Sequence, residues 1–295
     1  MEQFKKENNY ENIGPTAWRV AYQRTLSDIK YAKEIFDELD SFVKPSNSVQ
    51  TEYMESAKTS NLAPQFEARY KLINNLLEKN KTSQILEIAS GLAPRGLAMT
   101  EENPDLQYVE LDLPIMAGHK RKMLENLFVK GKAKPQNNLH IEDGDALDEK
   151  SLFKATRYFK NEPISVVNEG LLRYLNFNQK AVVAKNIHSL LEKFGGVWIT
   201  SDITLKKILT NQYKHERSDN RKRIIALSGI DVEANSFENE EEARNFFEKL
   251  DFSVERHSFL EVKDELVSPQ KLGLSLKVVE EMLCWAVVYV MKIKK

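Results

Sequence analysis

The chain has 295 residues, of which 41% are hydrophobic and 29% charged, with a formal net charge of -1. This composition is typical of a soluble globular protein, and the balanced charge excludes the global positive field that attracts nucleic acid or an anionic membrane. The length suits one large α/β domain with an extension, or two small domains.

No apolar stretch approaches the roughly 20 residues that span a bilayer, and the N-terminal segment MEQFKKENNYENIG lacks the apolar core of a signal peptide. We therefore expect a cytoplasmic protein with no membrane partner. The lone Cys284 cannot form an internal disulfide, and its apolar neighbours predict a buried, inert thiol. The five histidines are scattered and no Cys/His cluster has metal-ligand spacing, so no metal site is expected.

Residues 1–80 are expected to form an N-terminal helical cover. Apolar residues recur at three- and four-residue spacing over 16–43, which predicts an amphipathic helix that ends near Pro45. A second helix is predicted over 63–80, where Pro64 suits a position in the first turn.

Residues 81–295 are expected to form the core. Short apolar or alternating runs predict strands within 84–89, 106–113, 138–147, 164–175 and 195–203. Helical patterns fall between them, over 114–130, 148–159 and 178–194. Strands that alternate with helices at this spacing imply a parallel sheet covered on both faces.

The C-terminal part departs from this alternation. A helix predicted over 239–250 is followed by strand patterns within 252–262 and 281–293, and these two strands suit an antiparallel end of the sheet. Before them, residues 206–245 are expected to form a charged, helical insertion. This insertion is a candidate lid or substrate wall, and a solvated helical face is the alternative interpretation.

The loop after the first strand, ASGLAPRG, is the first place to look for a ligand, because open parallel sheets bind ligands beyond the carboxyl ends of their strands. Gly91 would let the backbone approach a ligand closely. A dinucleotide fingerprint needs G-x-G-x-x-G, whereas this loop has alanine at Ala89 and Ala93. The loop therefore argues against NAD or FAD and favours a ligand without phosphates.

Acidic residues follow the next strands. Glu110 and Asp112 lie about 20 residues after Gly91, the distance at which a carboxylate can accept both ribose hydroxyls of a nucleoside. Both lie on one face of the strand, and Asp112 is preferred because it stands at the carboxyl edge beside Pro114. A solvated strand-end acid is the alternative for Asp112.

Two further acids follow the third and fourth strands. Asp145 and Ala146 could offer a side-chain acceptor and a backbone N–H to an adenine edge, although a simple Asp-Gly turn explains this sequence equally well. Glu169 ends an apolar strand beside Gly170, where an ionised acid is costly without a partner. A helix-capping acid is the alternative for Glu169.

Taken together, the segments TAWRVAYQR, EIASGLAPRGL, YVELDLP, GDAL and NEGLLRYL resemble the leucine carboxyl methyltransferase family over roughly residues 14–205. The resemblance includes the bacterial O-methyltransferases of polyketide type. It implies a Rossmann-like α/β fold, with a mostly parallel seven-stranded sheet, an antiparallel C-terminal strand and an N-terminal helical cover. It also implies S-adenosylmethionine as the cofactor, and a small-molecule acceptor that is methylated on a carboxyl or hydroxyl oxygen.

The resemblance assigns cofactor-binding roles to the loops. Ala89 and Gly91 would pass under the methionine part of the cofactor, Asp112 would hold the ribose, and Asp145 with Ala146 would face the adenine.

It assigns the charged end of the cofactor to other residues. A basic residue of the N-terminal helices would bind the cofactor's carboxylate, and an arginine suits this role because its planar fork gives two parallel hydrogen bonds to a carboxylate. Arg69 is the first choice and Arg24 the second. A surface charge is the alternative for either arginine. Glu169 would lie near the cofactor's amino group. Many relatives carry G-A-G-x-D-T-R in the loop; here Pro94 replaces the usual pattern and no acid precedes Arg95, which leaves the partner of this arginine open.

Arg173 and Tyr174 are the candidate catalytic residues, because they could position an acceptor carboxylate at the rim of the site. A carboxylate acceptor needs alignment but no general base, whereas a phenol or alcohol must lose a proton. No His-Asp pairing is evident in the sequence, which favours an acidic acceptor. Two other functions stay open at this stage: a NAD(P)-dependent oxidoreductase and a non-catalytic methyltransferase-like binding module.

Overall fold

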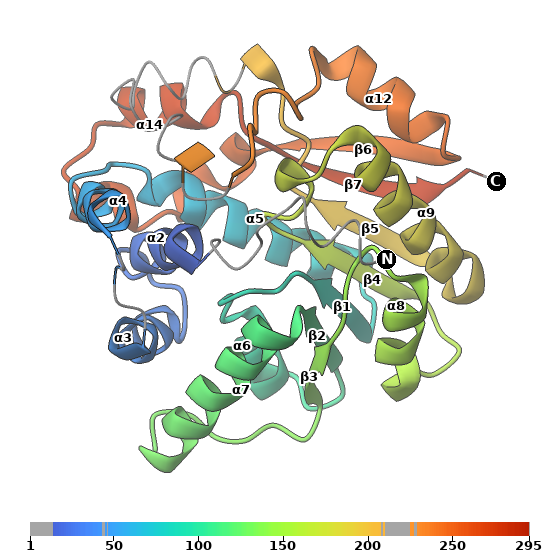
Figure 1. Ribbon diagram of the computed structural model, residues 1–295, viewed down its shortest axis with the longest axis horizontal. Coiled ribbons are helices and arrows are strands. Elements are labelled where there is room, and N and C mark those ends of the chain that lie inside the picture. Colours follow the sequence, from blue (N-terminus) through green and yellow to red (C-terminus); the bar gives the residue numbers. More distant parts are fainter. Residues whose placement is uncertain are drawn as a thin grey trace.

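The computed structural model describes residues 14–42, 45, 47–207, 209, 225–226 and 229–294. The strands in this part are β1 (Gln84–Ile88), β2 (Gln107–Asp112), β3 (Leu139–Asp143), β4 (Ile164–Asn168), β5 (Gly196–Thr200), β6 (Phe252–Ser258) and β7 (Val287–Ile293). They form a 7-stranded sheet in the order β3-β2-β1-β4-β5-β7-β6 (Figure 1).

The sheet is parallel except at its C-terminal end. The first five strands pair in parallel, whereas β7 pairs antiparallel with both β5 and β6. This arrangement confirms the predicted mostly parallel sheet with antiparallel C-terminal strands. Strand order reverses between β1 and β4, so that the loops after these two strands diverge and leave room for a ligand.

Helices cover both faces of the sheet. One face carries α8 (Glu149–Ala155), α9 (Phe177–Phe194) and α12 (Glu240–Glu248). The other carries α5 (Ala63–Asn80), α6 (Arg95–Glu102), α7 (Pro114–Val129) and α14 (Leu276–Leu283). Short helical segments η2 (Thr156–Tyr158), η3 (Leu172–Tyr174), η4 (Phe259–Glu265) and α13 (Ser268–Lys271) complete this part of the chain.

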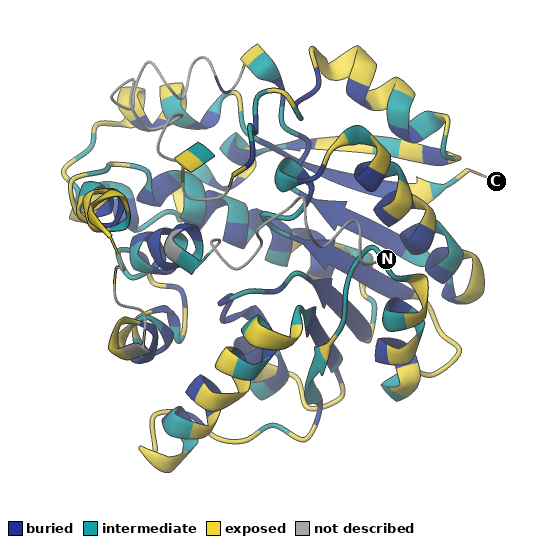
Figure 2. Ribbon diagram, viewed as in Figure 1, coloured by how far each residue is buried: buried dark blue, intermediate teal, exposed yellow. Residues whose placement is uncertain are grey.

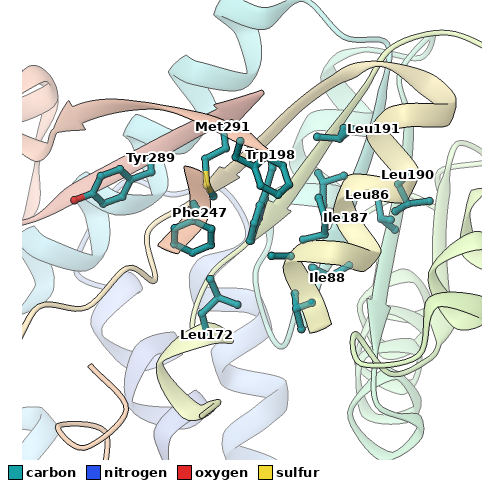
Figure 3. Packing of buried hydrophobic residues seen from close by; sticks show 14 of the residues in the cluster. Leu86, Ile88, Leu172, Ile187, Leu190, Leu191, Trp198, Phe247, Tyr289 and Met291 are labelled. Carbon is teal, nitrogen blue, oxygen red and sulfur yellow. The ribbon is translucent and has the colours of Figure 1, made fainter. Parts of the chain in front are cut away.

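Side chains of the strands alternate between two apolar cores. On the α9 face, Leu86 lies near Ile187 of α9, and Trp198 packs against Phe247 of α12, in one cluster (Figure 3). On the α5 face, Ile85 and Val167 pack with the helix instead. Figure 2 shows the strands buried between helices whose outer surfaces are exposed. Near-continuous apolar strands are what a parallel sheet covered on both faces requires.

Three further helices form the N-terminal cover together with α5: α2 (Gly14–Arg24), α3 (Ala32–Phe42) and α4 (Ser48–Lys58). The single helix predicted over 16–43 is wrong, because the chain turns between α2 and α3. The Ser27 hydroxyl donates to the carbonyl of Arg24 and accepts from the N–H of Ile29, which satisfies the helix end. The apolar periodicity runs on through this turn because Ile29 is itself buried. The helix α4 was not predicted.

The cover contacts the core at the C-terminal ends of α7 and α6. The buried Glu38 of α3 pairs with Lys130 and accepts from Asn126 at the end of α7. The Tyr31 hydroxyl donates to Glu101 of α6 at 2.5 Å. Apolar residues of α2 and α3 pack with α6 and α7 between these contacts. The cover therefore packs against α6 and α7.

Two C-terminal expectations need correction. Residues 281–283 belong to α14 rather than to the last strand, and Cys284 follows this helix half-buried instead of buried. Residues 208, 210–224 and 227–228 of the predicted 206–245 insertion lie outside the described residues, and residues 240–245 belong to α12, which packs on β6. Among the described residues, no helix combines the length and apolar character needed to cross a membrane.

The start of β5 allows a direct test of the β4–β5 pairing. Gly196 has a φ of +107°, and an added Cβ would overlap the carbonyl oxygen of Ile164 on β4. We expect Gly196→Ala to lower the free energy of unfolding by about 4 kcal/mol, since it combines backbone strain with overlap against main chain. At Gly131, where φ is +67° but no atom lies within 4 Å, alanine should cost only about 1 kcal/mol. Urea denaturation measures both, and equal costs would contradict this account of the pairing.

Candidate active site

A cavity of about 690 Å³ lies at the carboxyl ends of β1, β2, β3 and β4. The loops after these strands form one wall, and α2, α3, α4 and α5 of the cover contribute the opposite wall. The ten residues given cofactor-binding or catalytic roles from the sequence line it: Arg24, Arg69, Ala89, Gly91, Asp112, Asp145, Ala146, Glu169, Arg173 and Tyr174. The structure therefore brings the predicted set together, while the role of each residue stays a prediction.

The loop after β1 reaches the cavity through a left-handed backbone. Gly91 has a φ of +51°, and nothing lies within 4 Å of the position of a Cβ there. Ala89 also has a φ of +51°, a conformation that costs a non-glycine residue about 1–2 kcal/mol. The loop thus keeps the backbone path of a glycine-rich turn although alanine stands where such a turn carries glycine.

Asp112 ends β2 and fixes this loop. One carboxylate oxygen accepts the N–H of Gly91 at 2.6 Å, and the other accepts the N–H of Leu113 at 2.8 Å. Burial raises the pKa of Asp112, and these two N–H groups oppose that rise. Each oxygen keeps a lone pair for a further donor, as binding of two ribose hydroxyls requires.

Glu110, the other candidate on β2, lies below the loop and does not line the cavity. It is fully buried and forms an ion pair with Lys120 of α7 at 2.8 Å. Burial raises the pKa of Glu110 to about 7, against the opposing charge of Lys120. Lys120 also donates to the carbonyl of Ala93 at 2.5 Å, so this buried pair supports the loop from beneath.

Asp145 and Ala146 follow β3 at the next position along the cavity. One oxygen of Asp145 accepts the N–H of Leu147 at 2.9 Å, which is the Asp turn that the alternative interpretation expects. The carbonyl of Ala146 accepts from Asn186 of α9 at 3.0 Å, and its N–H makes no hydrogen bond within the described part of the chain. A free N–H beside a carboxylate suits the edge of an adenine.

The carboxylate of Glu169, at the end of β4, is surrounded by three guanidiniums. Arg24 of α2 contacts it through Nη2 at 3.0 Å and 3.2 Å, Arg69 of α5 through Nε at 2.6 Å, and Arg95 of α6 through Nη2 at 2.5 Å. Burial alone would raise the pKa of Glu169, but the three positive charges outweigh it and hold that pKa far below its usual range. A charged carboxylate in an apolar strand end thus has its partners.

Arg95 has acidic partners in the structure, although no acid precedes it in the loop after β1. Besides Glu169, it pairs with Glu87 of β1 and donates from Nε to Asn74 of α5 at 2.8 Å. The guanidinium is fully buried and lies 4.6 Å from the ring centroid of Tyr70. The acidic partners therefore come from two strands, and Pro94 leaves the helix start at Arg95 intact. A charged residue inside the buried run ILEIA, Glu87, was the available signal in the sequence.

The surface-charge interpretation of the two cover arginines is wrong. The side chains of Arg24 and Arg69 are 5% and 13% exposed. Burial lowers the pKa of Arg24, and the charge of Glu169 opposes this change. Its Nε is a buried donor without an acceptor among the described residues. The Nη nitrogens of Arg69 likewise make no hydrogen bond to a described residue, although they lie at the cavity wall.

The two candidate catalytic residues stand in η3. Arg173 and Tyr174 line the cavity next to one another, with the guanidinium 5.8 Å from the tyrosine ring centroid. Asp202, which follows β5, holds the preceding loop by accepting the N–H groups of Gly170 and Leu171, each at 2.6 Å. Sequence reasoning missed Asp202, although an acid directly after a strand was the signal used for the other sites.

The donor set of the cavity fits S-adenosylmethionine. Asp112 offers acceptors to hydroxyls, the Nη nitrogens of Arg69 offer unpaired donors to a carboxylate, and Gly91 leaves space beside the backbone. Among the residues that the structure describes, no three His, Cys, Asp or Glu side chains are grouped so as to hold a metal ion.

Solved structures share this fold. A protein of the DUF574 family from Streptomyces avermitilis MA-4680 is 14% identical, with a TM-score of 0.54 over 95% of this chain and 97% of that chain. An S-adenosylmethionine-dependent methyltransferase from Anabaena variabilis ATCC 29413 is 11% identical, with a TM-score of 0.50 over 80% of this chain and 86% of that chain. At such identities the likeness is one of fold.

The family follows from the sequence match. The sequence pattern of the leucine carboxyl methyltransferase family matches residues 13–188, more than half of the chain, and this stretch contains every cavity residue named above. No curated protein matches the chain. The match goes against the oxidoreductase alternative. The chain belongs to the leucine carboxyl methyltransferase family and is an S-adenosylmethionine-dependent methyltransferase.

Proposed function

We propose that the protein transfers the methyl group of S-adenosylmethionine to a carboxyl or hydroxyl oxygen of a small molecule. The observation that carries this proposal is the wall that the helical cover adds to the cavity. Helices α2, α3 and α4 contribute Val20, Leu39 and Gln50 to this wall, opposite the cofactor loops. A cavity of about 690 Å³ between two such walls suits a cofactor with a small acceptor rather than a protein surface.

The cofactor would lie along the loops in strand order. Asp112 would accept the ribose hydroxyls with the lone pairs that Gly91 and Leu113 leave free. Asp145 and the N–H of Ala146 would face the adenine edge. Ala89 and Gly91 would pass under the methionine part, where the left-handed backbone leaves space.

Arg69 is the better of the two arginines for the cofactor's carboxylate. Its Nε is engaged by Glu169, which leaves the Nη edge of the guanidinium available toward the cavity. Two parallel N–H groups on that edge match the two oxygens of a carboxylate. The Nε of Arg24 is buried, and its side chain is less exposed than that of Arg69, so Arg24 would act behind Arg69 through its charge.

The acceptor side would be formed by η3 and the cover. When bound, S-adenosylmethionine supplies a methyl group on a positively charged sulfur. Arg173 and Tyr174 would orient an acceptor oxygen toward it, and alignment of this kind carries much of the rate. His119 is the histidine among the described lining residues, and it has no carboxylate partner there. This favours an acceptor that is already ionised.

Cofactor binding can be tested at the end of β2. We expect Asp112→Asn to weaken the binding of S-adenosylhomocysteine by about 10- to 100-fold, because charge-assisted hydrogen bonds to the ribose are lost. Asp143→Asn is the matched control: Asp143 pairs with Asp112 in the β2–β3 register, but it is exposed and lies outside the cavity. Isothermal titration calorimetry measures both affinities. Equal losses in the two variants would argue against the ribose role.

Methyl transfer can be tested with methyl-labelled S-adenosylmethionine and a panel of small carboxylic acids and phenols. For an acid acceptor we expect kcat/KM to stay flat from pH about 6 to 9, because carboxylic acids are ionised above pH about 5. For a phenol the rate should rise with pH, since its pKa lies near 10. Binding of the cofactor without transfer to any member of the panel would instead support the non-catalytic binding module.

A further inference from the structure

The Glu169 carboxylate has its hydrogen-bonding capacity filled by the protein itself. Two oxygens offer about four lone-pair positions. One oxygen accepts from Arg24 at 3.0 Å and from Arg69 at 2.6 Å, and the other accepts from Arg95 at 2.5 Å and from Arg24 at 3.2 Å. An ammonium group that bound Glu169 directly would have to displace one of these guanidinium contacts.

The charge of the cluster also disfavours an ammonium. Three guanidiniums, those of Arg24, Arg69 and Arg95, meet two buried carboxylates, those of Glu87 and Glu169, and only Arg69 is more than 5% exposed. One positive charge is left in excess. In a buried environment, where charges are weakly screened, this excess repels a cation and attracts a carboxylate.

Exposure shows which member of the cluster a ligand can reach. The Glu169 and Arg24 side chains are each 5% exposed and that of Arg95 is fully buried, whereas Arg69 is 13% exposed. The donors left over on Arg24 and Arg69 belong to groups that Glu169 holds in place. A ligand that reaches the cluster therefore meets guanidinium N–H donors rather than the Glu169 carboxylate.

We propose that Glu169 is a positioning residue that orients Arg69 and Arg24 toward the cofactor's carboxylate and does not bind the cofactor's ammonium group. This inference rests on the cofactor placement proposed above. It replaces the role near the amino group that the family resemblance implied for Glu169. In the absence of Glu169, the guanidiniums would repel one another and Arg69 would lose its fixed orientation.

Three thioether ligands distinguish a Glu169 that orients the arginines from a Glu169 that binds the ammonium group. S-Adenosylhomocysteine carries both the ammonium and the carboxylate. The analogue 5′-deoxy-5′-(3-aminopropylthio)adenosine keeps the ammonium but lacks the carboxylate, and 5′-deoxy-5′-propylthioadenosine lacks both. The ratio of the first two affinities gives the carboxylate increment, and the ratio of the last two gives the ammonium increment. Calorimetry on the full chain measures each affinity without requiring turnover.

We expect Glu169→Asp, which keeps the charge of the cluster but draws the carboxylate back from the guanidiniums, to reduce the carboxylate increment about tenfold, because the hydrogen bonds from Arg69 and Arg24 are no longer directed. The ammonium increment should change by less than about twofold. Arg69→Gln covers the case in which Glu169→Asp does not fold: it should also reduce the carboxylate increment about tenfold, and its ammonium increment should rise, because it frees an acceptor position on Glu169 and removes one positive charge. Unchanged affinity for the propylthio analogue reports that the rest of the site is intact. Glu78→Asp, on the exposed side of α5, is the matched control and should alter neither increment.

A loss of the ammonium increment in Glu169→Asp, where the charge of the cluster is unchanged, would overturn the proposal, because it would make Glu169 a direct ligand of the amine. A carboxylate increment that survives in either variant would overturn it as well. If the wild-type protein binds S-adenosylhomocysteine but methylates no acceptor, the proposed function fails while this inference stands. Absence of any binding to the wild-type chain would overturn both.

Discussion

The burial of one carboxylate among three guanidiniums is the constraint on which the cavity depends. Glu169 at the end of β4 holds Arg24 of α2, Arg69 of α5 and Arg95 of α6, so one side chain joins the cover to the sheet. Burying charges is costly, and removing one partner of such a group destabilises proteins by about 3–5 kcal/mol. If the cover separated from the sheet, the buried charges would be exposed or left without partners. The contact therefore gives the cavity between cover and sheet a defined shape.

The second constraint is the turn after β1. This glycine-poor loop adopts the left-handed backbone that is typical of glycine-rich turns, because hydrogen bonds from neighbouring elements hold it in place. Asp112 accepts the N–H of Gly91, Lys120 donates to the carbonyl of Ala93, and the start of α6 is tied down by Arg95. These contacts offset the strain at Ala89. The loop approaches a ligand without the second glycine that a pyrophosphate needs, which agrees with a cofactor that has no phosphates.

The apolar pattern of the sequence was enough to predict the parallel strands. It also predicted that the acids after these strands gather at one site, because the carboxyl ends of parallel strands lie at the same edge of the sheet. It failed at the α2–α3 turn, where the buried Ile29 continues a helical pattern through a bend. It also failed for the partners of Arg95. Glu87 and Glu169 lie on different strands, and only the strand order places them beside one another. Asp202 was missed for a similar reason, since its partners are backbone N–H groups, which no sequence pattern distinguishes.

The most direct test of this account is a crystal structure of the protein with S-adenosylhomocysteine. We expect the ribose hydroxyls within hydrogen-bond distance of Asp112 and the carboxylate on the Nη edge of Arg69, with all three arginines still on Glu169. A complex in which the ligand's ammonium displaces an arginine from Glu169, or in which the ligand lies outside this cavity, would contradict the account.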